Sequence, residues 1–299
     1  MRFIAVLNRG GGTLRTMDLD AFEARMRDHL GEAGHTVDVR IVEGRDLMAA
    51  LGEAVAASDV DVVLAGGGDG TISAAASVVM DTGKALAVLP AGTMNLFARS
   101  LGMPLDLDSA LAAFSTGEIR EVDVATANGR PFVHQYSVGL HAKLVKIRDQ
   151  MKFSSRLGKM RASVRAAFAT LIRPPSMLVS IDIDGAEIIV RASGIGVTNN
   201  LFGEGHLPYA DHPDGGTLGV YVTTARRLPQ LLSALFHMLV GRWNRNAHVE
   251  IHTGKQVVLK FTRLHRRHRC VIDGELSPIE HETTIRIHPK SLRVLVPRM

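Results

Sequence analysis

The first 120 residues alternate between short apolar runs and stretches in which apolar side chains recur three or four positions apart. Runs such as residues 60–64 and 85–89 are typical of buried strands. Leu19, Phe22 and Met26 show the spacing of an amphipathic helix between two such runs. This alternation predicts an α/β domain with a doubly wound parallel sheet.

The pattern changes near residue 120, after which short β-rich runs dominate. Turn pairs such as Asp184-Gly185 and Thr253-Gly254 separate these runs and predict an antiparallel β-sandwich-like domain. Helical spacing within it predicts two helices, at residues 153–172 and 228–240. The expected domains are an α/β domain at residues 1–125 and a β-rich domain at residues 126–289, and residues 290–299 could return to the first.

Composition says more about the cellular compartment of the protein than about its binding partner. The single cysteine, Cys270, cannot form an internal disulfide, which favours a reducing compartment. The apolar run at the N-terminus is too short for a signal peptide, and no run approaches the ~20 apolar residues of a membrane span. We therefore expect a cytoplasmic protein with at most peripheral contact at the inner membrane face. The net charge of +5 is compatible with nucleic acid, anionic lipid or nucleotide phosphates.

A glycine-rich stretch, Gly67-Gly68-Asp69-Gly70-Thr71, lies between an expected strand and an expected helix. Glycines let the backbone approach a phosphate closely, and a helix N-terminus directs N–H groups at it. The carboxylate of Asp69 would repel a polyphosphate unless a cation lay between them. The motif therefore predicts a nucleoside triphosphate with Mg²⁺.

Two further loops are expected at the same edge of the sheet. Residues 8–13 contain three successive glycines, and residues 90–95 read Pro-Ala-Gly-Thr-Met-Asn. Both follow expected parallel strands, and ligands of such sheets bind at the carboxyl ends of the strands.

Three motifs together carry a family resemblance. They are the glycine-rich stretch from Gly67 to Thr71, Leu-Pro-Ala-Gly-Thr-Met-Asn-Leu-Phe-Ala-Arg at residues 89–99, and Asp273-Gly274-Glu275. The chain resembles the diacylglycerol-kinase catalytic family of lipid kinases, which includes bacterial soluble lipid kinases and the sphingosine and ceramide kinases. The resemblance covers essentially the whole chain. The first motif alone is also found in NAD kinases and phosphofructokinases.

The resemblance implies an ATP-binding first domain, a lipid-binding second domain and four catalytic acids. Asp69 and Asp123 would belong to a network of acid, water and magnesium. Asp273 would support the active-site magnesium, and Glu275 would be the general base that takes the proton from the lipid hydroxyl. The implied acceptor is a diacylglycerol-like lipid, a ceramide or a sphingoid base.

The resemblance also implies two sets of binding residues. Asp214, with Asp211 as a possible second ligand, would bind a structural magnesium through an Asp-Gly turn. The nucleotide would be held by Asn8, Gly67, Gly68, Asp69, Gly70, Thr71, Ser73, Gly92, Thr93 and Asn95.

Departures from the family pattern leave two alternatives open. Relatives commonly carry an acid at position 96, a threonine at 42 and an asparagine at 73, where this chain has Leu96, Val42 and Ser73. One alternative is a catalytically inactive lipid-binding homologue. The other is an NAD-kinase-like enzyme with a soluble substrate, which would share the first motif.

Basic side chains gather in two places. The run at residues 265–269 is either a solvated loop or a group that neutralises phosphate near Glu275. The larger cluster, at residues 143–165, is either a solvated helix face or a surface that docks on an anionic membrane. Neither has the interleaved aromatic residues of a nucleic-acid platform, so no nucleic-acid partner is expected, and a homodimer is left open. The larger cluster consists of Lys143, Lys146, Arg148, Lys152, Arg156, Lys159, Arg161 and Arg165.

Overall fold

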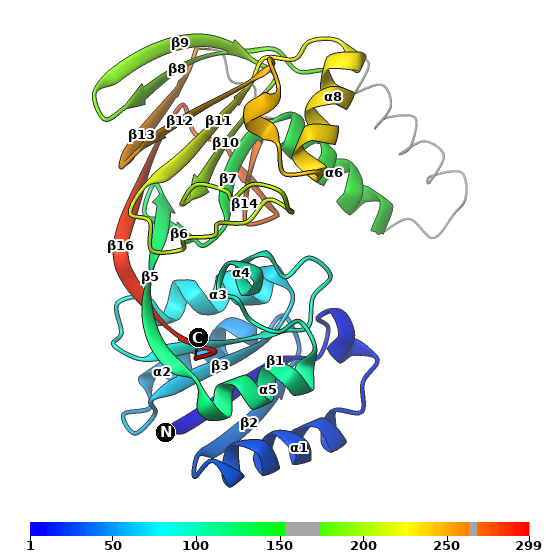
Figure 1. The fold of residues 1–299 in the computed structure, drawn as a ribbon, viewed down its shortest axis with the longest axis vertical. Coiled ribbons are helices and arrows are strands. Elements are labelled where there is room, and N and C mark those ends of the chain that lie inside the picture. The colour runs from blue at the N-terminus through cyan, green and yellow to red at the C-terminus, as the bar shows by residue number, and fades with distance from the viewer. Residues whose placement is uncertain (153–173, 263–267, 299) are drawn as a thin grey trace. The chain divides into compact units, whose positions relative to one another are not determined.

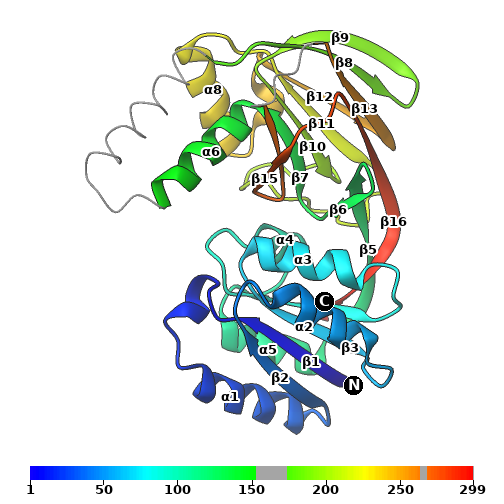
Figure 2. The same ribbon diagram turned by 180° about the vertical axis from the view of Figure 1, so that it is seen from behind.

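The computed structural model describes residues 1–152, 174–262 and 268–298 (Figures 1 and 2). It divides into two compact units, Met1–Val124 with His288–Met299, and Ala125–Ile287. Two strands, β5 (Glu118–Ala127) and β16 (Glu282–Val296), contribute residues to both units. The sequence placed the boundary at residue 125.

The first unit is built on a parallel sheet with the strand order β2-β1-β3-β4-β16. All its pairings are parallel, and Arg293 to Leu295 pair with Ala85 to Ala87 of β4. The end of the chain thus returns to this unit. Strands β3 and β4 are buried along their whole length, which explains their uninterrupted apolar sequences. The bounds are β1 (Arg2–Asn8), β2 (Thr36–Val42), β3 (Val62–Gly67) and β4 (Ala85–Pro90).

Helices cover both faces of this sheet, as expected for a doubly wound fold (Figures 1 and 2). Helix α1 packs beside α5, and α2 packs beside α3. Asp18 and Asp106 cap α1 and α5 by accepting a backbone N–H bond. The elements are η1 (Gly12–Arg15), α1 (Leu19–Glu32), α2 (Leu47–Ala56), α3 (Asp69–Val79), α4 (Leu96–Ser100) and α5 (Leu107–Thr116).

The second unit is a sandwich of two mainly antiparallel sheets. One has the order β12-β11-β10-β7-β14-β15, and the other contains β9, β8, β13 and β16, with β5 and β6 beside β16. Buried side chains from both sheets form one core, which includes Tyr136, Val179, Val197 and Leu259. The strands are β6 (Arg130–Phe132), β7 (Gln135–Gly139), β8 (Met177–Ile183), β9 (Ala186–Ala192), β10 (Gly194–Asn199), β11 (Leu218–Thr223), β12 (Val249–Gly254), β13 (Gln256–Phe261), β14 (Arg269–Ile272) and β15 (Glu275–Pro278).

The apolar run at residues 188–197 forms two strands in different sheets. It breaks at Ser193, whose backbone N–H and hydroxyl both donate to the carbonyl of Thr223. Strand β9 then pairs with β8, and β10 pairs with β7 and β11. The break lets one short segment pass from one sheet of the sandwich to the other.

Within the residues that the structure describes, two helices and one short 3-10 turn flank the sandwich. Helix α6 (Leu140–Lys152) packs on β14 through Ala142, Val145 and Val271. Helix α8 (Leu228–Leu239) lies close to the expected 228–240 and is followed by η2 (Trp243–Arg245). The helix expected at 153–172 lies outside the described residues. None of the helices that the structure describes is long and apolar enough to cross a membrane.

Candidate functional site

Three glycine loops meet at the carboxyl ends of β1, β3 and β4. A Cβ atom at Gly92 would lie 2.7 Å from the Cα of Gly68, and one at Gly11 would lie 3.2 Å from the Cα of Gly67. A Cβ at Gly12 would overlap the carbonyl oxygen of Ala91. The loops approach each other backbone to backbone, so glycine is required for packing as well as for access by a ligand.

Hydrogen bonds join the same three loops. The N–H of Thr13 donates to the carbonyl of Ala91 at 2.8 Å, and the N–H of Ala91 donates to Gly67 at 3.0 Å. The side-chain amide of Asn8 donates to the hydroxyl of Thr71 at 2.9 Å. Asn8 therefore links the loop at residues 8–13 to the glycine-rich motif.

Asp69 connects the first motif to the second. It is the first residue of α3, and its carboxylate accepts hydrogen bonds from the backbone N–H groups of Asn95 at 3.1 Å and Leu96 at 2.7 Å. The carboxylate thus satisfies donors at the start of α4, the short helix of the second motif. Each oxygen accepts one of these bonds and keeps acceptor capacity for a further partner such as a cation.

Asn95 fixes the shape of the loop at residues 90–95, which belongs to the second motif. Its backbone has φ +49°, and its buried side chain accepts from the N–H of Gly92 and donates to the carbonyls of Pro90 and Gly92. Thr93 is exposed on this loop. Asn95 therefore has a clear structural role beside the predicted contact with nucleotide.

The remaining predicted nucleotide residues follow Asp69 in α3. Thr71 is buried, whereas Gly70 and Ser73 are half-buried in the first turns of the helix. The helix N-terminus, Gly68 and Gly92 thus lie together on the loop edge of the sheet. Backbone N–H groups at such an edge can bind phosphate oxygens.

Asp123 lies on β5, and its side chain contacts β16. Its side chain is fully buried on β5, and its carboxylate accepts the backbone N–H of Lys290 at 2.9 Å. Lys290 has φ +56°, so the contact stabilises a left-handed residue within β16. Membership of Asp123 in the Asp69 network stays a prediction.

Asp273 and Gly274 form the two-residue turn between β14 and β15, with φ values of +45° and +85°. The buried carboxylate of Asp273 accepts three backbone N–H bonds of 2.9 Å, from Val133, His134 and Gln135. These contacts lie between the end of β6 and the start of β7. The side chain has a structural function here, and its support of magnesium stays a prediction.

Glu275 begins β15, and its side chain is 66% exposed. Its carboxylate lies 3.8 Å from Arg130 Nη2, and Nη1 of the same arginine donates to the hydroxyl of Ser277. Arg148 on α6 donates to the carbonyl of Gly274 at 2.9 Å. The predicted base is thus accessible, on a hairpin that two arginines contact.

The predicted structural-magnesium ligands lie in the loop before β11. Asp211 contacts the imidazole of His206 at 2.9 Å, and Asp214 is exposed. Asn200 fixes the loop by donating to the carbonyl of Pro213. Among the residues that the structure describes, no three His, Cys, Asp or Glu side chains group as metal ligands. A site built from Asp214 and backbone carbonyls stays a prediction.

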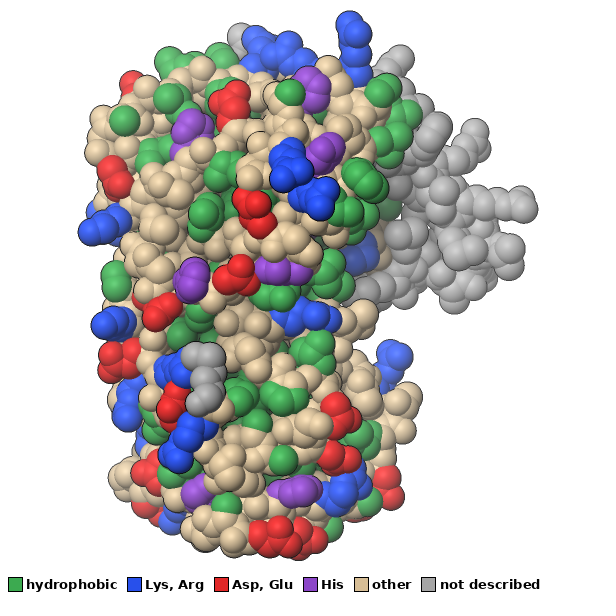
Figure 3. Space-filling view, in the orientation of Figure 1, with side chains coloured by type: hydrophobic (Ala, Val, Ile, Leu, Met, Phe, Trp, Pro, Cys, Tyr) green, Lys and Arg blue, Asp and Glu red, His purple; other side chains and the backbone are tan. Residues whose placement is uncertain are grey.

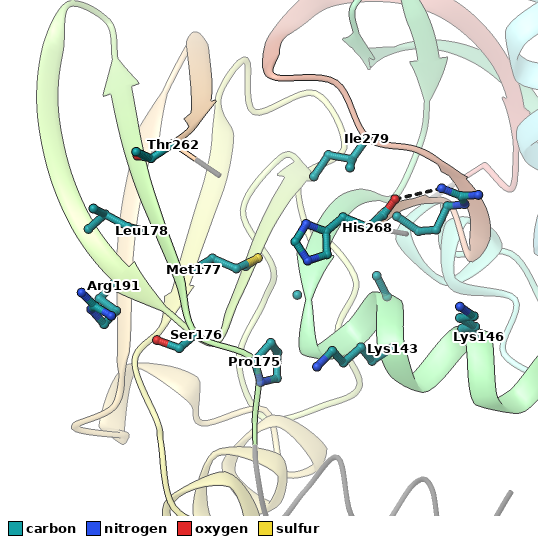
Figure 4. A pocket seen from close by; sticks show the side chains of 13 residues that line it. Lys143, Lys146, Pro175, Ser176, Met177, Leu178, Arg191, Thr262, His268 and Ile279 are labelled. Atoms are coloured by element: carbon teal, nitrogen blue, oxygen red, sulfur yellow. Dashed lines mark hydrogen bonds between the residues drawn. The ribbon is translucent and has the colours of Figure 1, made fainter. Parts of the chain in front are cut away.

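The sequence did not reveal a pocket of about 720 Å³ in the second unit (Figure 4). Met177, Leu178 and Ile279 give it apolar walls, and Figure 4 shows the Met177 side chain pointing toward its middle. Cationic side chains from α6, β9 and β14 also line it. They are Lys143, Lys146, Arg191 and Arg269.

The two halves of the chain match two family models. Residues 2–127 match the diacylglycerol kinase catalytic domain, and residues 135–296 match the YegS C-terminal NAD kinase beta sandwich-like domain. A Yersinia enterocolitica protein named "Probable lipid kinase YegS-like" is 30% identical over 236 residues, which cover 73% of this chain and 75% of that protein.

Other relatives extend the comparison. An uncharacterized Synechocystis protein is 27% identical over 79% of this chain, and the match spans 54% of its own length. A crystal structure of a diacylglycerol kinase from Bacillus anthracis has the same fold, with a TM-score of 0.73, 20% identity and coverage of 99% and 96%. The fold, the glycine loops and the two family models together place the chain in the diacylglycerol kinase class of proteins. The chain belongs to its YegS-like family, which confirms the resemblance that the three motifs predicted.

Proposed function

We propose that this protein transfers the γ-phosphoryl group of ATP, in the presence of Mg²⁺, to a hydroxyl group of a membrane lipid. The observation that carries the proposal is the hydrogen bonding of Asp69 to the second loop, where the three glycine loops converge. The two matching family models support the same reaction class.

The loops suit a nucleotide phosphate chain. Their glycines leave the backbone open to close approach, and the N-terminus of α3 favours negative charge. The two carboxylate oxygens of Asp69 each keep acceptor capacity, which fits a hard cation that prefers oxygen ligands. Mg²⁺ bound there would neutralise charge that develops on the phosphoryl oxygens. Asp69 would then bind the cation and the loop at residues 90–95 at the same time.

Glu275 is the proposed general base. A neutral alcohol is a poor nucleophile, so removal of its proton by a carboxylate assists attack on phosphorus. The side chain is exposed enough to reach an acceptor hydroxyl, and Arg130 lies beside it.

The pocket of the second unit is the proposed place for the acceptor lipid. Its apolar walls suit acyl chains, and its cations suit a neutral or anionic head group. Lys143, Lys146 and Arg191 make no ion pair within residues 1–152, 174–262 and 268–298. Their charge disfavours the ammonium group of a sphingoid base. We therefore rank diacylglycerol-like lipids and ceramides above sphingoid bases as acceptors.

The test is transfer of labelled γ-phosphate from ATP to diacylglycerol, ceramide and sphingosine in mixed micelles, with and without Mg²⁺. Product on the first two lipids, dependent on Mg²⁺, is expected. Glu275→Gln should abolish transfer, and Glu282→Gln should not. The control is matched, because Glu282 is also exposed and lies 3.7 Å from Lys260. Equal activity of Glu275→Gln and the native chain would show that Glu275 is not the general base.

Two alternatives are tested in the same assay. The second family model is named for an NAD kinase-like sandwich, so NAD is included as a soluble acceptor. Phosphorylation of NAD and not of lipid would replace the proposal. Leu96, at the position of an acid in relatives, favours an inactive homologue, and ATP binding without turnover on any acceptor would support it.

A further inference from the structure

Helix α8 exposes an apolar stripe to the surroundings. Leu232, Leu235, Phe236 and Leu239 are 50%, 41%, 62% and 57% exposed. Their spacing of three and four residues puts them on one face of the helix. Single exposed apolar residues are common on protein surfaces, but a continuous stripe of this kind marks an interaction site.

The helix is held firmly on its other side. Leu231 is buried, and Ser233 accepts a hydrogen bond from the side-chain amide of Asn246. The side chain of Gln230 accepts the backbone N–H groups of Arg226 and Arg227 and so caps the first turn. The outward direction of the stripe is therefore fixed by the fold.

The chain segment that contains the stripe is basic. Residues 215–249 contain no Asp or Glu. Arg226 and Arg227 precede the helix, Arg242 and Arg245 follow it, and all four are exposed. Within the described part of the chain, none of the four is in an ion pair. Figure 3 shows hydrophobic side chains beside Lys and Arg side chains at the place of α8.

This combination selects one kind of partner. Twelve residues of helix extend about 18 Å, which is too short to span a bilayer but suits a helix lying in its interface. A symmetric dimer through the stripe would bring the same arginines of two copies together, and like charges repel. Anionic lipid offers both apolar chains and opposite charge.

We propose that α8 docks this protein on membranes that contain anionic lipid. Leu232, Leu235, Phe236 and Leu239 enter the boundary between head groups and acyl chains, and Arg226, Arg227, Arg242 and Arg245 contact the anionic head groups. This surface differs from the basic cluster predicted at residues 143–165, which lies partly outside the described residues. It does not depend on the proposed kinase reaction.

The experiment is sedimentation of the full chain with vesicles, without ATP. Vesicles of phosphatidylcholine alone are compared with vesicles of equal parts phosphatidylcholine and phosphatidylglycerol. The native chain should bind the second kind more tightly. Phe236→Ser with Leu239→Ser should weaken that binding roughly tenfold or more. The matched control is Met48→Ser with Ile189→Ser, since these apolar residues are 54% and 70% exposed elsewhere.

The charge is tested separately. Arg226→Gln with Arg227→Gln should weaken binding to the anionic vesicles only, whereas Arg45→Gln, at another exposed arginine, should not. Thermal unfolding verifies that each variant is folded, and phosphoryl transfer to micellar lipid should persist in all of them. Unchanged vesicle binding by the folded α8 variant would overturn the proposal. Conversion of a native dimer into a monomer by that variant, measured by light scattering, would equally overturn it in favour of a second copy.

Discussion

The carboxylate of Asp69 accepts a 2.7 Å hydrogen bond from the backbone N–H of Leu96. Relatives commonly carry an acid at position 96, but the contact uses the main chain, which any residue supplies. The connection between the glycine-rich motif and the second loop therefore survives the substitution. Only the additional side-chain carboxylate is lost.

Asp69→Asn should impair both stability and catalysis. The amide can accept one of the two backbone N–H bonds, and its NH₂ group would face the other donor. We expect the free energy of unfolding to fall by about 1–3 kcal/mol. Transfer to lipid should fall on the order of 100-fold. Denaturant titration and initial rates measure these effects. Asp81→Asn is the control, because Asp81 is an exposed aspartate in the same unit.

Substitutions of Asn95 should separate backbone strain from side-chain bonding. Asn95→Gly loses three side-chain hydrogen bonds but tolerates φ +49°, whereas Asn95→Ala loses the bonds and is also strained. We expect the alanine variant to be less stable than the glycine variant by about 1 kcal/mol. Both should raise the KM for ATP, because the loop that carries Thr93 loosens. Equal ATP KM values in both variants and the native chain would contradict a role in shaping the loop.

Gly92→Ala tests the close approach of the loops. The added methyl would lie 2.7 Å from the Cα of Gly68 and from Oδ1 of Asn95, so the two loops must separate. We expect a loss of about 1–3 kcal/mol in unfolding free energy, together with weaker ATP binding. Gly31→Ala is the matched control. Position 31 lies in α1 with open space around it, and alanine there should stabilise the chain by up to about 1 kcal/mol.

Asp273 and Glu275 should behave differently although they are two residues apart. Asp273→Ala leaves three backbone N–H donors without their acceptor, and we expect it to destabilise the chain by about 2–5 kcal/mol. Glu275→Gln should unfold like the native chain because its side chain is exposed. Urea unfolding followed by circular dichroism compares them. A stable Asp273→Ala variant without activity would instead favour the magnesium role implied by the family.

His141 should make stability fall in mildly acidic solution. Burial, and then repulsion from Arg148, lower the pKa of its imidazole in the folded state. The unfolded chain therefore binds more protons as the pH falls below about 6.5, and the native state loses stability there. His141→Gln can keep a hydrogen bond to Ser137 and should reduce the slope of unfolding free energy between about pH 6.5 and 5. Thermal melts across this range test the expectation, and an unchanged slope would contradict it.

The sequence predicted the first unit well because its central strands are buried on both faces. Runs such as Ala85–Pro90 are then apolar throughout and alternate with clear helical spacing. The glycine loops were found for a related reason, since close backbone approach restricts those positions to one residue type.

The breaks in the second unit could not be predicted locally. The interruption at Ser193 depends on the carbonyl of Thr223, and the one after Phe132 depends on the carboxylate of Asp273, 140 residues from Val133. The stripe on α8 was missed because the apolar spacing at residues 228–240 indicates a helix without showing which face is covered. The absence of acids from residues 215–249 was the signal that could have found it.

The pairing of Arg293–Leu295 with β4 has a consequence for biosynthesis. A ribosome releases the glycine loops early, but residues 288–296 emerge only after the whole second unit has been made. Until then β4, buried along its length in the finished fold, has an open edge that could pair with other chains. The first unit is thus expected to mature last, although most of it is translated first.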